Sequence, residues 1–120
     1  MNLSAISQYR VMWIFVFYDL PTETKIQRKN HSKFRKNLIE DGFNMFQFSV
    51  YFRHCSSKEN LEVHANRVKS FMPEMGKISI VNFTDKQFER MEVFYGKKLP
   101  RNHKKTNAKE LQPPMQLELF

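Results

Sequence analysis

Cysteine is nearly absent from this 120-residue chain, and its scarcity excludes two kinds of site. With Cys55 as the single cysteine, the chain can form neither an internal disulfide nor a zinc site built from several thiolates. The histidines lack the close spacing of a metal-binding pair; they are His31, His54, His64 and His103. This thiol content fits a reducing compartment, and we expect the protein to work in the cytoplasm.

Long apolar runs are also missing. The longest, residues 11–18, is far shorter than the roughly 20 residues that cross a bilayer, so we expect no membrane segment. Residues 1–10 have no charged segment followed by a long apolar stretch. We therefore expect no secretory signal and interpret these residues as a flexible N-terminal arm.

Acidic residues are few relative to basic ones. Asp and Glu number 12 against 20 Lys and Arg, which gives a net charge of +8. Such a balance favours a polyanionic partner, most often nucleic acid, although a basic protein can also be merely soluble. A hydrophobic content of 41% with 12 Phe suits the core of one small domain.

Hydrophobic patterning predicts the first half of the domain, which we place at residues 11–96. Residues 11–19 are apolar at nearly every position before Asp19, which is typical of a strand covered on both faces. Residues 22–42 predict a helix, capped by Thr22 or Thr24 and ended by Gly42. Residues 43–55 alternate over a length that predicts two strands separated by a bend at 47–49.

The second half of the domain begins with an amphipathic helix. Residues 56–73 carry a possible capping box of Ser56 and Glu59, and their buried stripe is expected to be Leu61, His64, Ala65, Val68, Phe71 and Met72. We interpret His64 as a packed side chain rather than a ligand. A strand is predicted at 76–84, followed by a helix at 84–96 with Thr84 and Gln87 as a second capping box.

This order predicts an α+β fold, a ferredoxin-like βαββαβ sandwich. Two main helices cover one face of a four-stranded sheet, yet residues 11–18 are apolar on both faces. Leaving that surface exposed costs about 25 cal/mol per Å². A second copy packed sheet against sheet is the interpretation that we favour, and the alternative is the chain's own tail folding back over the sheet.

The C-terminal region has a different composition. Residues 97–114 are basic and contain three prolines, so we expect a flexible tether. Residues 115–120 alternate again, with Met115, Leu117 and Leu119 on one face. We interpret them as an extra strand that pairs with a sheet edge in a homodimer.

Asp19 is the candidate chemical residue. Near a two-fold axis it would meet a second Asp19, and two carboxylates suit a shared Mg²⁺ or Mn²⁺ that supports phosphodiester cleavage. The competing hypothesis is that the Asp19 carboxylate caps the following turn by accepting backbone N–H groups. The sequence pattern alone favours the cap.

Basic side chains are the candidate phosphate contacts. Lys25, Lys29, Lys33 and Lys36 fall within about 80° of arc on the predicted helix, a pattern also typical of a solvated helix face. The full candidate set is Lys25, Arg28, Lys29, Lys33, Arg35, Lys36, Arg53, Lys97, Lys98, Arg101, Lys104 and Lys105. Phe46, Phe48 and Phe52 can stack on bases in principle, but we interpret them as core.

Three stretches resemble the CRISPR-associated protein 2 family: "YDLPTET", "FRKNLIEDGFNMFQFSVYFR" and "TDKQFERM". The ending "QLELF" is most similar to members from type II systems. The resemblance implies a ferredoxin-like homodimer that bridges dimers of the CRISPR-associated integrase and binds the double-stranded DNA fragment being inserted. It also implies a metal-dependent endonuclease acting on single-stranded RNA or double-stranded DNA, with Asp19 as the shared metal ligand. Lys25 and Arg28 match the family's basic positions loosely.

One carboxylate per chain is a sparse set of metal ligands, and no His or Glu is placed as a general base. We therefore expect the scaffold role to dominate and cleavage to be weak. A third hypothesis, motivated by size and fold, is an interferase toxin or a small regulatory dimer unrelated to CRISPR systems.

Overall fold

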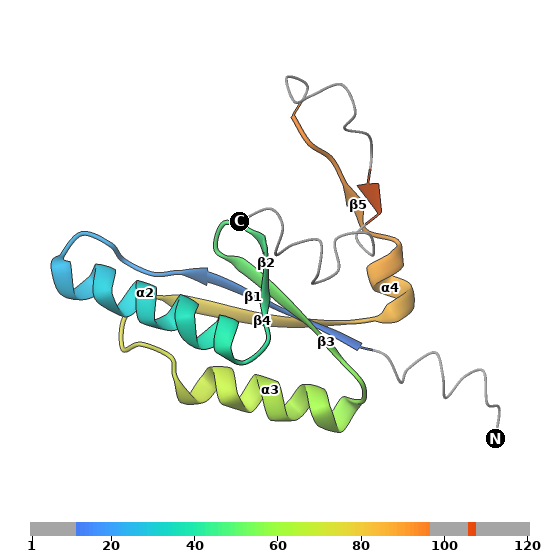
Figure 1. The fold of residues 1–120 in the computed structure, drawn as a ribbon, viewed down its shortest axis with the longest axis horizontal. Helices are drawn as coiled ribbons and strands as arrows, with labels where there is room; N and C mark the ends of the chain where they lie inside the picture. Colours follow the sequence, from blue (N-terminus) through green and yellow to red (C-terminus); the bar gives the residue numbers. More distant parts are fainter. Residues whose placement is uncertain (1–11, 97–105, 108–120) are drawn as a thin grey trace.

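The computed structural model describes residues 12–96 and 106–107 (Figure 1). The elements follow in the order β1 (Met12–Asp19), α2 (Lys25–Glu40), β2 (Asn44–Gln47), β3 (Val50–Cys55), α3 (Lys58–Ser70), β4 (Lys77–Thr84), α4 (Asp85–Glu89), β5 (Glu92–Val93) and β6 (Thr106–Asn107). The fold is therefore α+β, as the sequence predicts.

Strand β1 is the centre of a four-stranded sheet. The order across the sheet is β2-β3-β1-β4, and each neighbouring pair is antiparallel. Phe15 lies opposite Phe52 of β3 on one edge and opposite Val81 of β4 on the other. Both edges of β1 are thus hydrogen-bonded, which leaves β2 and β4 as the sheet edges.

Helices α2 and α3 lie on the same side of the sheet (Figure 1). Alternate side chains of β1, namely Ile14, Val16 and Tyr18, are buried in one cluster with Phe34 and Leu38 of α2. Leu61 and Val68 of α3 complete this cluster from the second helix. We call this side of the sheet the helix face.

The opposite side of the sheet, the open face, is partly covered by the chain's own helix α4, a cover that the sequence analysis did not anticipate. Trp13 and Phe15 of β1 are buried there in a cluster with Phe88 of α4. The rings of Trp13 and Phe88 stack with centroids 3.9 Å apart, and Trp13 Nε1 donates to Asp85 Oδ1. The short helix covers one end of this face because its aromatic residue fits between those of the strands.

At the other end of the open face, apolar side chains stay accessible. Phe17 is 40% exposed and Val81 is 38% exposed, although their strand neighbours are buried. Phe48 lies in the turn between β2 and β3 and is 88% exposed, so its assignment to the core is wrong. Ser49 has a φ of +63°, and this turn breaks the alternation that would have buried Phe48.

Helix caps follow the predicted chemistry with one shift. Thr84 and Gln87 form the predicted capping box at α4. Thr24, one of the two predicted caps of α2, also forms a capping box, with Gln27, which the sequence analysis did not predict. The cap of α3 is Ser57, which accepts the N–H of Asn60, rather than Ser56. Because α3 ends at Ser70, Met72 lies beyond the helix and is 39% exposed, contrary to its place in the predicted stripe.

The helix predicted at 84–96 is too long. Helix α4 ends at Glu89, and Glu92–Val93 form β5, which pairs with Thr106–Asn107 of β6. This pairing joins residues distant in sequence, so local periodicity gives no sign of it. It also places a strand inside the segment predicted to be a tether.

Several predictions lie outside the described residues: the arm 1–10, the remainder of the tether and the strand 115–120. Within the described part of the chain, no helix combines the length and apolar character needed to cross a membrane.

The burial of Phe88 generates a stability prediction. Phe88→Ala removes a fully buried ring that contacts three aromatic neighbours, so we expect a loss of about 3–5 kcal/mol in the free energy of unfolding. Urea denaturation followed by circular dichroism measures this change. Ile26→Ala, at an exposed position on α2, is the control, with an expected change within about 0.5 kcal/mol. Equal effects of the two substitutions would show that α4 is not part of the core.

Candidate nucleic-acid interface

Asp19 ends β1 on the open face of the sheet. Side chains alternate along the strand, so Asp19 shares the side of Trp13, Phe15 and Phe17. It is exposed, and the described residues provide no hydrogen bond or ion pair to its carboxylate. The hypothesis that Asp19 caps the following turn is therefore wrong for this structure.

A shallow hollow of about 350 Å³ surrounds this carboxylate. It is lined by Phe17, Tyr18, Asp19, Ser49, Val50, Lys77 and Ser79, and we call it the Asp19 hollow. Among the described residues no group of three His, Cys, Asp or Glu side chains is arranged to hold a metal ion. A single chain thus supplies one carboxylate, which does not fit the ligand demand of Mg²⁺ or Mn²⁺.

The outer surface of α2 carries the predicted lysines. Lys25, Lys29, Lys33 and Lys36, the α2 basic stripe, are all exposed and make no ion pair with a described residue. Phe34 lies on the opposite side of the helix and is 1% exposed, which fixes the stripe outward. The stripe therefore presents uncompensated positive charge to solvent.

Two arginines beside the stripe have structural partners. Arg28 donates from Nη1 to the carbonyls of Thr22 and Glu23, where the chain enters α2. Arg35 Nε donates to the hydroxyl of Tyr51 over 2.7 Å. Burial raises the pKa of the neighbouring Tyr18 phenol, and Tyr51 adds to this effect. Both guanidinium groups stay exposed enough to add charge to the α2 surface.

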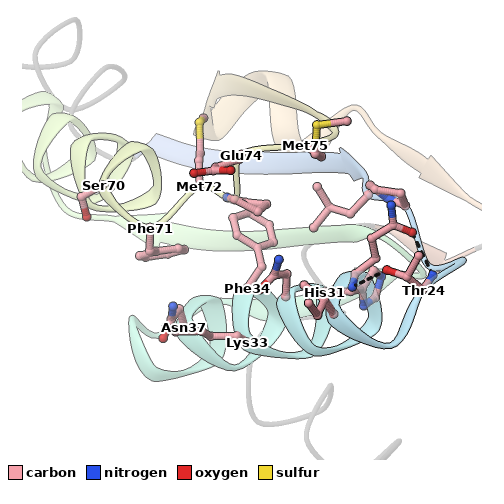
Figure 2. A pocket seen from close by; sticks show the side chains of 16 residues that line it. Thr24, His31, Lys33, Phe34, Asn37, Ser70, Phe71, Met72, Glu74 and Met75 are labelled. Atoms are coloured by element: carbon pink, nitrogen blue, oxygen red, sulfur yellow. Dashed lines mark hydrogen bonds between the residues drawn. The ribbon is translucent and has the colours of Figure 1, made fainter.

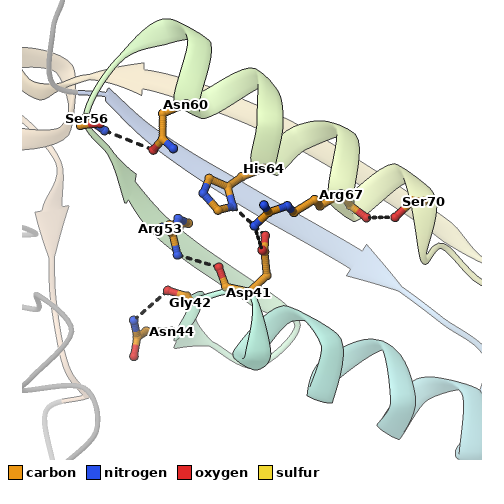
Figure 3. Close-up of polar contacts among 9 residues, drawn as sticks. All are labelled: Asp41, Gly42, Asn44, Arg53, Ser56, Asn60, His64, Arg67 and Ser70. Atoms are coloured by element: carbon orange, nitrogen blue, oxygen red, sulfur yellow. Dashed lines mark hydrogen bonds and ion pairs between the residues drawn. The ribbon is translucent and has the colours of Figure 1, made fainter.

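Arg53 does not join the other candidates. It belongs to β3, on the helix face of the sheet, and its Nη1 donates to the carbonyl oxygen of Asp41 over 2.6 Å (Figure 3). Its Nε is buried with no partner among the described residues. Gly42 has a φ of +88°, and a Cβ there would overlap the Arg53 guanidinium. Arg53 thus packs under the end of α2, and we leave it out of the interface.

A partly buried polar cluster beside Arg53 was missed by the sequence analysis. Asp41 accepts hydrogen bonds from Arg67 Nη1 at 2.9 Å and bonds His64 Nδ1 at 2.8 Å, which joins α3 to the end of α2 (Figure 3). His64 is 4% exposed, so the interpretation of a packed histidine is confirmed. Its acidic partner was not visible because Asp41 lies 23 residues away in the chain.

A larger groove lies between α2 and the loop after α3 (Figure 2). It has a volume of about 780 Å³, and its walls include Phe34, Phe71, Met72 and Met75. Lys33 is the one residue of the α2 basic stripe that lines it. The groove is lined by both apolar and polar side chains and lies on the helix face, whereas the Asp19 hollow lies on the open face.

The candidate residues thus separate into two surfaces. The α2 basic stripe faces outward from the helix layer, whereas Asp19 lies on the open face of the sheet. The remaining basic candidates lie outside the described residues: Lys97, Lys98, Arg101, Lys104 and Lys105. The same holds for Met115, Leu117 and Leu119 of the predicted terminal strand.

The fold and the charged surfaces define a small basic α+β protein with an exposed cationic helix. The family model for CRISPR associated protein Cas2 matches residues 12–91. The chain belongs to the Cas2 family, so the hypothesis of a dimer unrelated to CRISPR systems is wrong.

Relatives agree with this assignment. The CRISPR-associated endoribonuclease Cas2 of Flavobacterium psychrophilum is 54% identical over 99% of this chain and 96% of its own length. The protein of the same name from Parvibaculum lavamentivorans is 45% identical over 91% of this chain and its full length. A solved crystal structure of cas2 has a TM-score of 0.51 at 24% identity, covering 75% of this chain and 93% of its own, and supports the fold alone.

Proposed function

We propose that this chain is the spacer-acquisition subunit of a CRISPR system. It acts as a homodimer that bridges integrase dimers and binds the double-stranded DNA fragment being integrated. The observation that carries the proposal is the α2 basic stripe, exposed and without ion pairs to described residues, in a member of the Cas2 family.

The electrostatic argument concerns the stripe itself. Four lysines along one side of a rigid helix match the even line of charge on a DNA backbone, and their binding releases condensed counterions. Because the capping box of Thr24 and Gln27 fixes the start of α2, this surface is preorganised before DNA arrives. The contact is to phosphates, so it is expected to be indifferent to sequence, as a protein that accepts many fragments requires.

The lysine stripe generates a binding prediction. Lys29→Ala with Lys33→Ala is expected to weaken binding of duplex DNA and to reduce the slope of log affinity against log salt by about 1.8. Fluorescence anisotropy over a salt series measures both quantities. The matched control is Lys58→Ala with Lys69→Ala on α3, which removes the same charge from another exposed surface. A salt slope that falls equally in both variants would contradict a DNA-binding role for the stripe.

The proposal of a dimer is supported by the apolar side chains at the uncovered end of the open face. Phe17 and Val81 are partly exposed on neighbouring strands, and Phe48 projects from the adjoining turn. An apolar patch with a polar margin is typical of an interface between copies. Asp19 and Lys77 lie at that margin, so a second copy would bring two Asp19 side chains toward each other.

A charged residue in this patch tests the dimer. Phe17→Glu is expected to convert the dimer to monomer at micromolar concentration, because two carboxylates would be buried without partners. Sedimentation velocity measures the change in mass. Val63→Glu, at an exposed apolar position on α3, is the control and is expected to remain dimeric. A dimeric Phe17→Glu protein would place the interface elsewhere.

Finer parts of the proposal rest on sequence and topology. The strand order β2-β3-β1-β4 supports the ferredoxin-like class. The ending "QLELF" supports a type II system, and the lone, buried Cys55 is compatible with work in the cytoplasm.

The second candidate function is a metal-dependent endonuclease, and the name endoribonuclease that the relatives carry favours the cleavage of RNA. Asp19 of one chain is insufficient for a Mg²⁺ or Mn²⁺ site, so the candidate requires Asp19 from a second copy. A bound ion would supply Lewis acidity at a phosphodiester of single-stranded RNA or double-stranded DNA. This chain's contribution would be to hold the ion through the freely accessible Asp19 carboxylate.

The substitution Asp19→Asn tests the endonuclease against the scaffold function. If the nuclease is real, this nearly isosteric change is expected to abolish Mg²⁺-dependent cleavage of labelled RNA and DNA while leaving the dimer intact. Gel electrophoresis of the products, with and without Mg²⁺, provides the measurement. Glu23→Gln removes an exposed carboxylate outside the hollow and is expected to leave cleavage unchanged. Cleavage that persists in Asp19→Asn would eliminate the metal hypothesis.

A further inference from the structure

Three segments of the chain converge around the Asp19 hollow. Tyr18 donates its backbone N–H to Ser49 O at 3.0 Å, which holds the β2–β3 turn against the end of β1. On the other edge of β1, Asp19 lies opposite Lys77 in the strand register. The hollow thus places a carboxylate, an ammonium group and the hydroxyls of Ser49 and Ser79 around one space.

Gly76 fixes the position of Lys77. It has a φ of +110°, and a Cβ at this residue would lie 2.9 Å from the Asp19 backbone oxygen and 2.5 Å from Leu20 Cδ2. The chain can therefore start β4 this close to Asp19 only with glycine at position 76. Lys77 follows Gly76 directly and lies opposite Asp19 in the antiparallel register of β1 and β4. The backbone therefore sets its place beside the carboxylate.

The charge of Lys77 is available to a ligand. Its side chain is exposed and makes no ion pair with Asp19 or with any other described residue. An isolated Asp19 would repel a phosphodiester, and an adjacent ammonium group offsets that repulsion. The hydroxyls of Ser49 and Ser79 are half-buried and can donate to phosphate oxygens.

We propose that Lys77, assisted by Ser79, binds a phosphodiester group of a nucleic-acid strand in the Asp19 hollow. Lys77 would hold the backbone beside Asp19, on the opposite side of the domain from the α2 basic stripe. This inference rests on the proposed function in one respect, that the protein binds nucleic acid. It adds a second, separate contact surface on β4.

The test measures binding by the full-length protein without metal. Fluorescence anisotropy in EDTA, over a salt series, compares a short single-stranded RNA with a short DNA duplex. Lys77→Met is expected to weaken binding of at least one ligand roughly threefold to tenfold. The salt slope is expected to fall by about 0.7 for the single strand or about 0.9 for the duplex. The ligand whose binding is weakened, single-stranded RNA or duplex DNA, is the one that enters the Asp19 hollow.

Matched variants separate charge from structure. Lys77→Arg keeps the cation and is expected to retain binding, whereas Lys69→Met removes an exposed lysine of α3 and is expected to bind as wild type does. Asp19→Asn is expected to strengthen binding in EDTA, since it removes the repulsive carboxylate. The two substitutions are thus expected to change the affinity in opposite directions, Lys77→Met lowering it and Asp19→Asn raising it. A purely structural role of Lys77 and Asp19 would not produce this result.

Three results would overturn the inference. If Lys77→Met binds nucleic acid as the wild type does, while substitutions in the α2 basic stripe weaken binding, the phosphodiester site in the Asp19 hollow is refuted. The proposed function then still stands. Absence of salt-dependent binding by the wild-type protein would refute both. Sedimentation velocity shows whether Lys77→Met is still a dimer. If this variant becomes a monomer but binds as much nucleic acid per milligram as the wild-type protein, Lys77 belongs to a contact between copies.

Discussion

The double-sided burial of β1 is the constraint on which the rest of the structure depends. The strand is hydrogen-bonded to β3 and β4 and packed between two clusters, one with α2 and α3 and one with α4. The register of the strand is therefore fixed, because a shift of one residue would move its side chains to the opposite faces of the sheet. Asp19, at the end of this strand, is consequently held on the open face.

This layered arrangement separates the proposed DNA-binding surface from the candidate chemical residue Asp19. The α2 basic stripe lies outside the helix layer, and the carboxylate lies on the far side of the sheet. A DNA segment resting on the stripe is therefore not presented to Asp19 of the same chain. The separation favours a scaffold that holds DNA by its backbone, and it implies that any cleavage uses a differently placed strand.

Polar side chains within the helix layer serve the fold. Asp41 binds His64 and Arg67 through its carboxylate and Arg53 through its carbonyl, so one residue at the end of α2 anchors both α3 and β3. Removing one partner would leave a buried polar group without its hydrogen bond, which costs about 1–3 kcal/mol. Arg53 and His64 therefore have a structural explanation that is independent of nucleic acid.

The sequence by itself determined the local features of this protein. The apolar strand ending at Asp19, the caps at Thr24 and Thr84 and the outward lysines of α2 all follow from short-range patterns. The tertiary structure decided the coverage of Trp13 by Phe88, the pairing of β5 with β6 and the place of Lys77 beside Asp19. These features join residues far apart in the chain, and periodicity reports only which side of an element is apolar, not what packs against it.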